Sequence, residues 1–155
     1  MAVNPKDDIL RLDSNVPYQI SVLSHRIARE TAAITERHGG LNISQWRVMA
    51  AVAERPGRTA NEVVAITPMD KGIVSRAVKA LLDKGMLARK ASNEDGRLGH
   101  LFLTARGEKK YAALAADIRG IEAELLSGLS GEDAARLRRL IGALCQSFQG
   151  GPQEV

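Results

Sequence analysis

The chain has 155 residues, of which 45% are hydrophobic and 26% are charged, a balance typical of a globular protein and not of a disordered chain or a membrane protein. Aromatic residues make up only 3% of it, so its core must be built from aliphatic side chains. The net charge of +4 is unevenly placed, because residues 70–110 carry +5 while the other 114 residues sum to −1. Such a basic segment attracts polyanions, although a basic face that is merely solvated is the alternative.

The N-terminus and the single cysteine indicate the compartment. Residues 1–15 contain no apolar run and carry three aspartates, so they do not resemble a secretory signal. No stretch approaches the roughly 20 apolar residues that span a bilayer. Cys145 alone cannot form an intramolecular disulfide or a multi-cysteine zinc site, and it suits a reducing compartment. We therefore expect a cytoplasmic protein with no membrane partner.

The first half of the chain is predicted to be helical. Residues 1–15 are expected to form a flexible arm. Over residues 16–38 apolar side chains recur every three or four positions, which predicts a helix that ends at a pair of glycines. A second helix is expected from an N-cap at Ser44 to Glu54, with Pro56 after it.

Two further helices have stronger start signals. Thr59 and Glu62 have the spacing of a capping box, which predicts a short helix from there to Ile66. Thr67, followed by a proline, is expected to cap the next helix, which continues until Gly85 ends it. Two helices joined by almost no loop must meet at a sharp angle, which is the geometry of a helix-turn-helix.

The two faces of the predicted helix 70–84 differ in chemistry. One side collects the aliphatic residues Ile73, Val74, Ala77, Val78, Leu81 and Leu82. The other collects short or charged residues, namely Gly72, Ser75, Arg76, Lys79 and Asp83. A generic surface helix would more often alternate Glu with Lys, so this pattern favours an outer face that lies in the major groove of DNA.

A hairpin is expected after this helix. Residues 86–90 and 98–103 are predicted strands, and residues 91–97 between them are polar and rich in turn formers. An arginine near such a tip, Arg97, can enter the minor groove, where the potential is most negative. Asp95 could orient that arginine or simply shape the turn. An ordinary exposed hairpin with an incidental arginine is the alternative.

The last third is predicted to form two helices that exceed what a winged domain needs. Thr104 is expected to cap the first, and the second begins near Ser130. The first carries a seam of apolar residues at alternating spacings of three and four, typical of a coiled coil: Tyr111, Leu114, Ile118, Ile121 and Leu125. The second gathers Leu137, Leu140, Ile141, Leu144 and Phe148 on one face. A two-fold dimer would cover these surfaces, and folding back on the chain's own domain is the alternative.

In this order the elements resemble the MarR family of bacterial and archaeal regulators, over about residues 16–148. The segments that carry the resemblance are Ile43–Val48, Gly72–Arg76, Leu81–Arg89, Asp95–Arg97 and Leu103–Gly107. The resemblance implies a homodimer that reads the two half-sites of a palindrome in double-stranded DNA, with its wings in the flanking minor grooves. It also implies regulation, usually repression relieved by a small aromatic acid or phenol.

Carried over by position, the resemblance implies a set of DNA-contacting residues, which are Lys71, Gly72, Ser75, Arg76, Lys79, Asp95 and Arg97. Two positions depart from the family pattern. The wing has Gly96 where a first arginine is common, so one charge contact is missing. The recognition helix has Gly72 where serine or threonine is common, which removes one hydrogen bond to DNA.

An effector site is expected only by analogy with the family. The candidates are Tyr18, His25, Arg29 and Trp46, because an aromatic acid needs a cation and a flat apolar wall. Core packing is the favoured alternative for Trp46, and a solvated stripe is the alternative for His25 and Arg29. Cys145 lies among apolar residues with no adjacent histidine or lysine to activate its thiol, so we expect a buried, structural cysteine.

Other classes of protein fit less well. The three histidines are scattered, and neither a metal-ligand pair nor a nucleotide-binding or nucleophile motif is present, so no enzyme, cofactor or metal site is expected. A winged helix that binds protein, or a DNA-binding regulator without an effector, remains open. The sequence thus predicts a mainly α fold with a minor β component. A winged helix-turn-helix at 41–103 would sit between dimerisation helices at 16–38 and 104–148, and a flexible tail would follow at 149–155.

Overall fold

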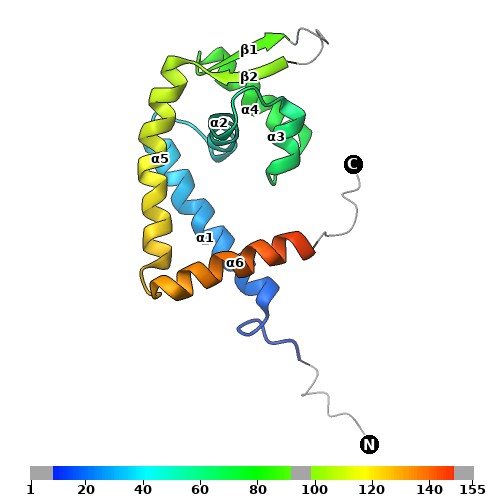
Figure 1. Cartoon of the computed structure of the whole chain (residues 1–155), viewed down its shortest axis with the longest axis vertical. Coiled ribbons are helices and arrows are strands. Elements are labelled where there is room, and N and C mark those ends of the chain that lie inside the picture. Colours follow the sequence, from blue (N-terminus) through cyan, green and yellow to red (C-terminus); the bar gives the residue numbers. More distant parts are fainter. Residues whose placement is uncertain (1–8, 92–98, 149–155) are drawn as a thin grey trace, which may run out of the picture. The chain divides into compact units, whose positions relative to one another are not determined.

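The computed structural model describes residues 9–91 and 99–148 of the chain. In chain order its elements are α1 (Val16–Arg37), α2 (Ile43–Glu54), α3 (Ala60–Ile66), α4 (Lys71–Asp83), β1 (Leu87–Ala91), β2 (Gly99–Leu103), α5 (Ala105–Leu126) and α6 (Gly131–Ser147) (Figure 1). The predicted fold class, mainly helical with a small β component, is confirmed. The chain divides into two compact units, Met1–Ile118 and Arg119–Val155.

The core of the first unit is aliphatic, as the scarcity of aromatic residues requires. Helix α2 packs against α4, α3 and β2 (Figure 1). The completely buried apolar side chains are Leu41, Val48, Met49, Val52, Val63, Val74, Val78, Leu81, Leu101 and Leu114. Burying one such Val or Leu stabilises a fold by roughly 1.5–3 kcal/mol. Of the helices described, none combines the length and hydrophobicity that crossing a bilayer requires.

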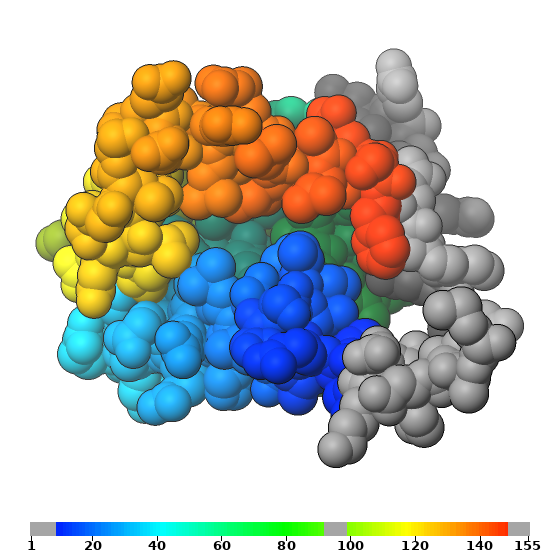
Figure 2. Space-filling view, turned by 90° about the horizontal axis from the view of Figure 1, so that it is seen from below, coloured from blue at the N-terminus to red at the C-terminus, as the bar shows by residue number. Residues whose placement is uncertain are grey.

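Helix α1 agrees with the predicted helix over 16–38. Asn15 caps its start, with Oδ1 accepting a hydrogen bond from the Tyr18 backbone N–H at 2.9 Å. Gly39 and Gly40 end it, and both adopt positive φ angles, of 96° and 66°. Only the C-terminal part of α1 reaches the core, through Thr31, Ile34 and Thr35. Its N-terminal half lies at the surface (blue in Figure 2).

The predicted N-cap of the second helix is wrong. Asn42, and not Ser44, caps α2, because its Oδ1 accepts a hydrogen bond from the Gln45 N–H at 2.9 Å. The Gln45 side chain accepts in return from the Asn42 N–H at 3.2 Å, which completes a capping box. Ser44 therefore lies inside the first turn, where its hydroxyl is not needed as a cap.

The predicted N-cap of the recognition helix is also wrong. Asp70 caps α4, with Oδ1 accepting from the Ile73 N–H at 2.7 Å. Thr67 instead ends α3, where its hydroxyl donates to the Val63 carbonyl at 2.7 Å. The Thr67 hydroxyl is bound to the preceding helix and cannot cap α4, whereas the Asp70 carboxylate reaches a free N–H in the first turn of α4. The link between the helices is thus residues 67–70, while the Thr59–Glu62 capping box of α3 is confirmed.

The end of α4 is joined tightly to the start of α5. Gly85 has φ 65° and donates to the Leu82 carbonyl at 2.9 Å, which ends α4 as the sequence predicts. The Thr104 hydroxyl donates to the Gly85 carbonyl at 2.7 Å and accepts from the Gly107 N–H at 3.1 Å. A Cβ on Gly107 would lie only 2.0 Å from the Met86 carbonyl oxygen. The first turn of α5 therefore approaches the backbone after α4 as closely as a glycine allows.

The predicted coiled-coil seam does not remain free along α5. Leu114 is completely buried, and Ala115 is 7% exposed, so this part of α5 belongs to the core of the first unit. In the second unit, Leu125 is 42% exposed. The first half of the seam therefore packs into the chain's own core, while Leu125 near its end stays exposed.

The second unit contains the end of α5, a turn and α6. Ser130 caps α6 by accepting from the Asp133 N–H at 3.1 Å, and Arg138 pairs with Glu122 at 2.8 Å. One face of α6 exposes large apolar side chains, which are Leu140, Ile141, Leu144 and Phe148. Cys145 is also exposed, so the prediction of a cysteine buried within the chain is wrong. The residues around it are apolar, but they face solvent and do not cover it.

Candidate nucleic-acid interface

The two faces of α4 separate as the sequence pattern requires. Val74, Ala77, Val78 and Leu81 are buried against the core. The residues of the opposite face are all exposed or partly exposed, and they are Lys71, Gly72, Ser75, Arg76, Lys79 and Asp83. A helix with this surface presents hydroxyl and cationic donors along one side, which is the chemistry that reads phosphates and the base edges of a major groove.

Gly72 has no side chain, and the side chains of Asp70 and Arg76 lie close to its backbone. A Cβ at this position would lie 3.2 Å from Asp70 Oδ1 and 3.4 Å from the Arg76 guanidinium. The Asp70 carboxylate is held there because it caps α4. The arginine therefore lies across the bare backbone of the first turn, beside the start of the helix.

Lys79 has a partner on its own helix. Its ammonium group lies 2.8 Å from Asp83 Oδ2, one turn further along. The hydrogen bond from Lys79 to Asp83 raises the pKa of Lys79, so the lysine stays cationic. Because the side chains of Lys79 and Asp83 are 77% and 63% exposed, the pair contributes little to stability. A phosphate could therefore compete with Asp83 for this lysine at small cost.

A polar hollow adjoins the outer face of α4. It has a volume of about 410 Å³ and lies between α4 and the first turn of α2. Arg76 lines it from α4, and Asn42, Ser44 and Gln45 line it from the start of α2. Sequence reasoning did not include these residues in the interface. The Asn42–Gln45 capping box was the signal that could have located the start of α2 here.

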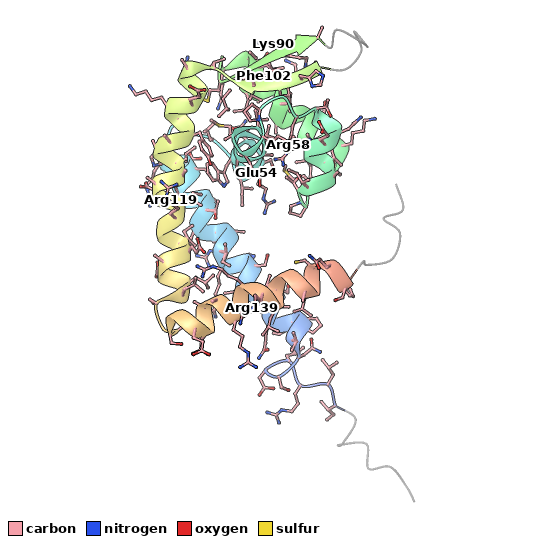
Figure 3. All side chains as sticks on the ribbon, viewed as in Figure 1. Glu54, Arg58, Lys90, Phe102, Arg119 and Arg139 are labelled. Atoms are coloured by element: carbon pink, nitrogen blue, oxygen red, sulfur yellow. The ribbon has the colours of Figure 1, made fainter. Side chains whose placement is uncertain are left out.

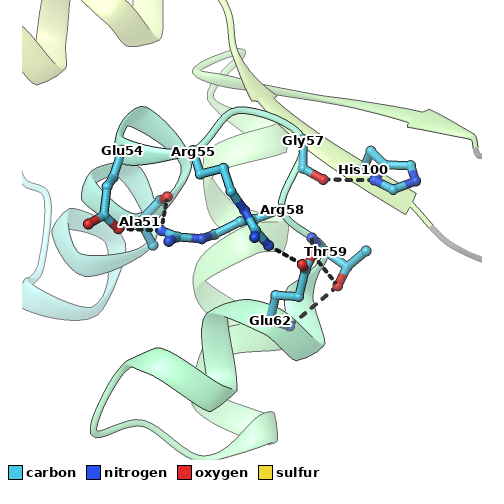
Figure 4. A network of polar contacts seen from close by, with 8 residues as sticks. All are labelled: Ala51, Glu54, Arg55, Gly57, Arg58, Thr59, Glu62 and His100. Atoms are coloured by element: carbon cyan, nitrogen blue, oxygen red, sulfur yellow. Dashed lines mark hydrogen bonds and ion pairs between the residues drawn. The ribbon is translucent and has the colours of Figure 1, made fainter.

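Polar contacts join the end of α2, the loop after it, the start of α3 and β2 (Figure 4). Arg58 donates to the Ala51 carbonyl and to Glu54, each at 2.6 Å, and thereby closes the end of α2. His100 of β2 contacts the Gly57 carbonyl through Nδ1 at 2.7 Å. The side chain of Arg58 is only 12% exposed, so this cation serves the fold and is not available to a ligand.

The same network includes Glu62 at the start of α3 (Figure 4). Its carboxylate accepts hydrogen bonds from the Thr59 N–H at 2.7 Å and from the Thr59 hydroxyl at 3.1 Å, and it pairs with Arg55. The backbone hydrogen bond from Thr59 is the main cause that lowers the pKa of Glu62. The first helix of the helix-turn-helix is thus joined to the loop that precedes it.

The base of the hairpin carries two exposed cations that sequence reasoning did not place in the site. They are Arg89 and Lys90 of β1, which pairs antiparallel with β2. The Lys90 ammonium lies 4.8 Å from the ring centroid of Phe102 (Figure 3). The predicted tip residues Asp95 and Arg97 lie outside the described residues, so their roles stay predictions.

The four effector candidates are not brought together. Trp46 stacks on Tyr111 with ring centroids 5.5 Å apart, and it lines a hollow of about 370 Å³ between α1 and α2. Tyr18 lies by a different hollow, beside Leu12. His25 and Arg29 are at the surface, and neither lines the hollow at Trp46.

The cation beside Trp46 is its neighbour in the sequence. Arg47 lines the same hollow, together with apolar residues of α1 such as Ile27. Sequence reasoning missed Arg47 because adjacent helix positions usually point in different directions. In the residues that the structure describes, no group of three His, Cys, Asp or Glu side chains could hold a metal ion.

The chain is similar to known transcriptional regulators. Residues 39–98 match the sequence model of the MarR family. The HTH-type transcriptional regulator BilQ of Clostridium symbiosum is 27% identical over 105 residues, which cover 68% of this chain and 73% of BilQ. The transcriptional regulator HosA of Escherichia coli O111:H- is 28% identical over 97 residues, 63% of this chain and 72% of HosA.

Solved structures share the fold over most of the chain. A probable transcriptional regulator from Pseudomonas aeruginosa has a TM-score of 0.73 at 26% identity, covering 86% of this chain and 99% of that one. A MarR/EmrR family regulator from Acinetobacter sp. ADP1 has a TM-score of 0.81 at 22% identity, covering 89% and 97%. Residues 39–98, which match the MarR sequence model, contain α2 to β1 and so carry the helix-turn-helix. Residues 39–98 therefore match the MarR family, and over most of its length the chain resembles DNA-binding transcriptional regulators, which are not enzymes.

Proposed function

We propose that the protein is a homodimeric repressor that binds a palindromic operator on the nucleoid, in the cytoplasm. The observation that carries this proposal is the outer face of α4, where Ser75, Arg76 and Lys79 are exposed together beside a polar hollow. The excess positive charge of residues 70–110 also supports DNA binding through this part of the chain, because positive charge attracts the phosphate backbone. Arg97 is proposed to complete the contact in the minor groove, with Asp95 orienting that arginine.

The dimer is proposed to form through residues 16–38 and 104–148, and residues 41–103 to hold the DNA-binding domain. Exposed apolar side chains on α1 and α6 support this division, among them Ile20, Leu23, Leu140 and Leu144. Apolar surface of this kind favours association with an identical copy. A two-fold dimer would present two recognition helices to successive major grooves, which is why a palindrome is expected.

The proposed effector is a small aromatic acid that binds in the hollow at Trp46. Its volume of about 370 Å³ suits a molecule of that size. The indole ring offers a flat wall, and Arg47 offers a cation for the carboxylate. Tyr18, His25 and Arg29 are left out of this refined site because they do not line the hollow.

The operator can be found by selecting bound fragments from random DNA. We expect a palindromic consensus, and a DNA-binding assay then compares Arg76→Ala and Lys79→Ala with the control Arg37→Ala, which removes a cation from the end of α1. Each change on α4 should weaken operator binding by about 1–3 kcal/mol if a base contact is lost. Arg97→Ala should weaken binding to all sequences alike. Equal affinities in all four variants would overturn the proposed DNA face.

The effector is tested with the same operator. A panel of aromatic acids should release the DNA, and the fluorescence of Trp46, the only tryptophan, should report binding directly. Arg47→Gln should lower the response to the acid while leaving DNA affinity in its absence unchanged. Release of DNA that is unaffected by Arg47→Gln would contradict the site, and no release by any acid would favour a regulator without an effector.

A further inference from the structure

A second hollow is lined by Tyr111, the ring that stacks on Trp46. It has a volume of about 270 Å³ and is formed by the end of α2, strand β2 and the first turns of α5. Tyr111 lines this hollow, whereas Trp46 lines the one between α1 and α2. The two hollows have no lining residue in common, so they are separate sites.

The walls of the second hollow are mostly apolar and partly aromatic. Val52 contributes from α2, Pro56 from the turn after α2, Phe102 from β2 and Tyr111 from α5. The ring of Phe102 already has a cation near it, because the Lys90 ammonium lies 4.8 Å from its centroid (Figure 3). Because the Phe102 ring already holds this cation, the aromatic wall offers surface for a ligand's ring and does not itself favour a second positive charge.

Among the described residues that line this hollow, Glu108 is the only charged one. Its side chain makes no hydrogen bond or ion pair with any other residue that the structure describes. A carboxylate beside aromatic and aliphatic walls disfavours an anion and favours an organic cation with a flat apolar body. This charge is opposite to that of Arg47 in the first hollow.

We propose that this second hollow binds a small aromatic ammonium compound. Its charged nitrogen would face the Glu108 carboxylate, and its ring would lie against Phe102 and Tyr111. The site is distinct from the proposed effector site at Trp46 both in position and in charge. The protein would then have two ligand sites of opposite charge preference, one lined by Trp46 and the other by Tyr111.

The probe is benzyltrimethylammonium, with phenylacetate as the compound of opposite charge. Both are titrated into the full-length, isotope-labelled protein, and backbone amide shifts are followed by NMR. We expect saturable shifts at residues that line the second hollow with the ammonium probe. Glu108→Gln should weaken this binding by about two- to fivefold, as expected for one exposed charge pair. Ala53→Leu should abolish it by filling the hollow, and Glu30→Gln is the matched control on α1.

Three results would overturn this proposal. Benzyltrimethylammonium could cause no saturable shift in the folded protein, or phenylacetate could bind the same residues as tightly. Glu108→Gln could also lower the melting temperature yet leave the ammonium titration unchanged, which would assign the carboxylate to the helix terminus alone. The experiment contains no DNA and does not measure DNA release, so its failure would leave the proposed repressor function intact.

Discussion

Glu62 shows how a single carboxylate can set the start of a helix. It accepts two hydrogen bonds from Thr59, pairs with Arg55, and its own N–H donates to the Thr59 hydroxyl at 3.3 Å. The loop before α3 and the first turn of α3 are therefore held by the same side chain. This arrangement needs the ionised carboxylate, so it depends on pH.

We expect Glu62→Gln to make the protein less sensitive to acid. The folded-state pKa of Glu62 lies below the ordinary value of 4.5, so its contribution is present above that value and is lost as the pH falls through the folded-state pKa. Denaturant unfolding from about pH 6 to about pH 3 should therefore show a larger loss of stability in the wild type than in Glu62→Gln. Parallel losses in the two proteins would contradict this role.

The first turn of α5 closely approaches the backbone that follows α4. Gly107 has no space for a side chain, because a Cβ would lie 2.0 Å from the Met86 carbonyl oxygen. Gly120, on the same helix, has open space beside it, because nothing outside its own helix backbone would lie within 4 Å of an added Cβ. The same substitution to alanine can therefore be compared at a crowded position, Gly107, and at an open one, Gly120.

Gly107→Ala should destabilise the protein by about 3 kcal/mol, because α5 must move away from the hairpin. Gly120→Ala should instead stabilise it by up to about 1 kcal/mol, since alanine is the better helix former. Urea unfolding of both variants measures this difference. A Gly107→Ala protein as stable as the wild type would mean that α5 does not pack so closely.

Local patterns predicted the elements well, and tertiary contacts explain what they missed. The faces of α4 and the capping box at Thr59 follow from neighbours within four residues, so they could be read from the sequence. The caps Asn42 and Asp70 were missed because serine and threonine nearby offered equally plausible signals. The Trp46–Tyr111 stack joins α2 to α5, far apart in the chain, and no local pattern encodes it.

At the scale of the whole molecule, the exposed apolar face of α6 is the feature that most needs a partner. Leu144→Glu should convert the proposed dimer to a monomer, because a charge there would have to be buried in the interface. Analytical ultracentrifugation should show half the mass, and operator affinity should fall by at least about tenfold, since two half-sites would no longer be bound together. Gln146→Glu is the control on the opposite side of α6. An unchanged mass for Leu144→Glu would remove α6 from the interface.

The central claim, that the outer face of α4 binds DNA, is tested most directly by the salt dependence of operator binding. Fluorescence anisotropy with a labelled operator gives the dissociation constant at several salt concentrations. Each lost phosphate contact should reduce the slope of log affinity against log salt by about 0.9. Arg76→Ala should therefore reduce it by about 1.8 per dimer if the arginine contacts phosphate, while Arg37→Ala should not change it. Identical slopes and affinities for the wild type, Arg76→Ala and Lys79→Ala would contradict DNA binding through α4.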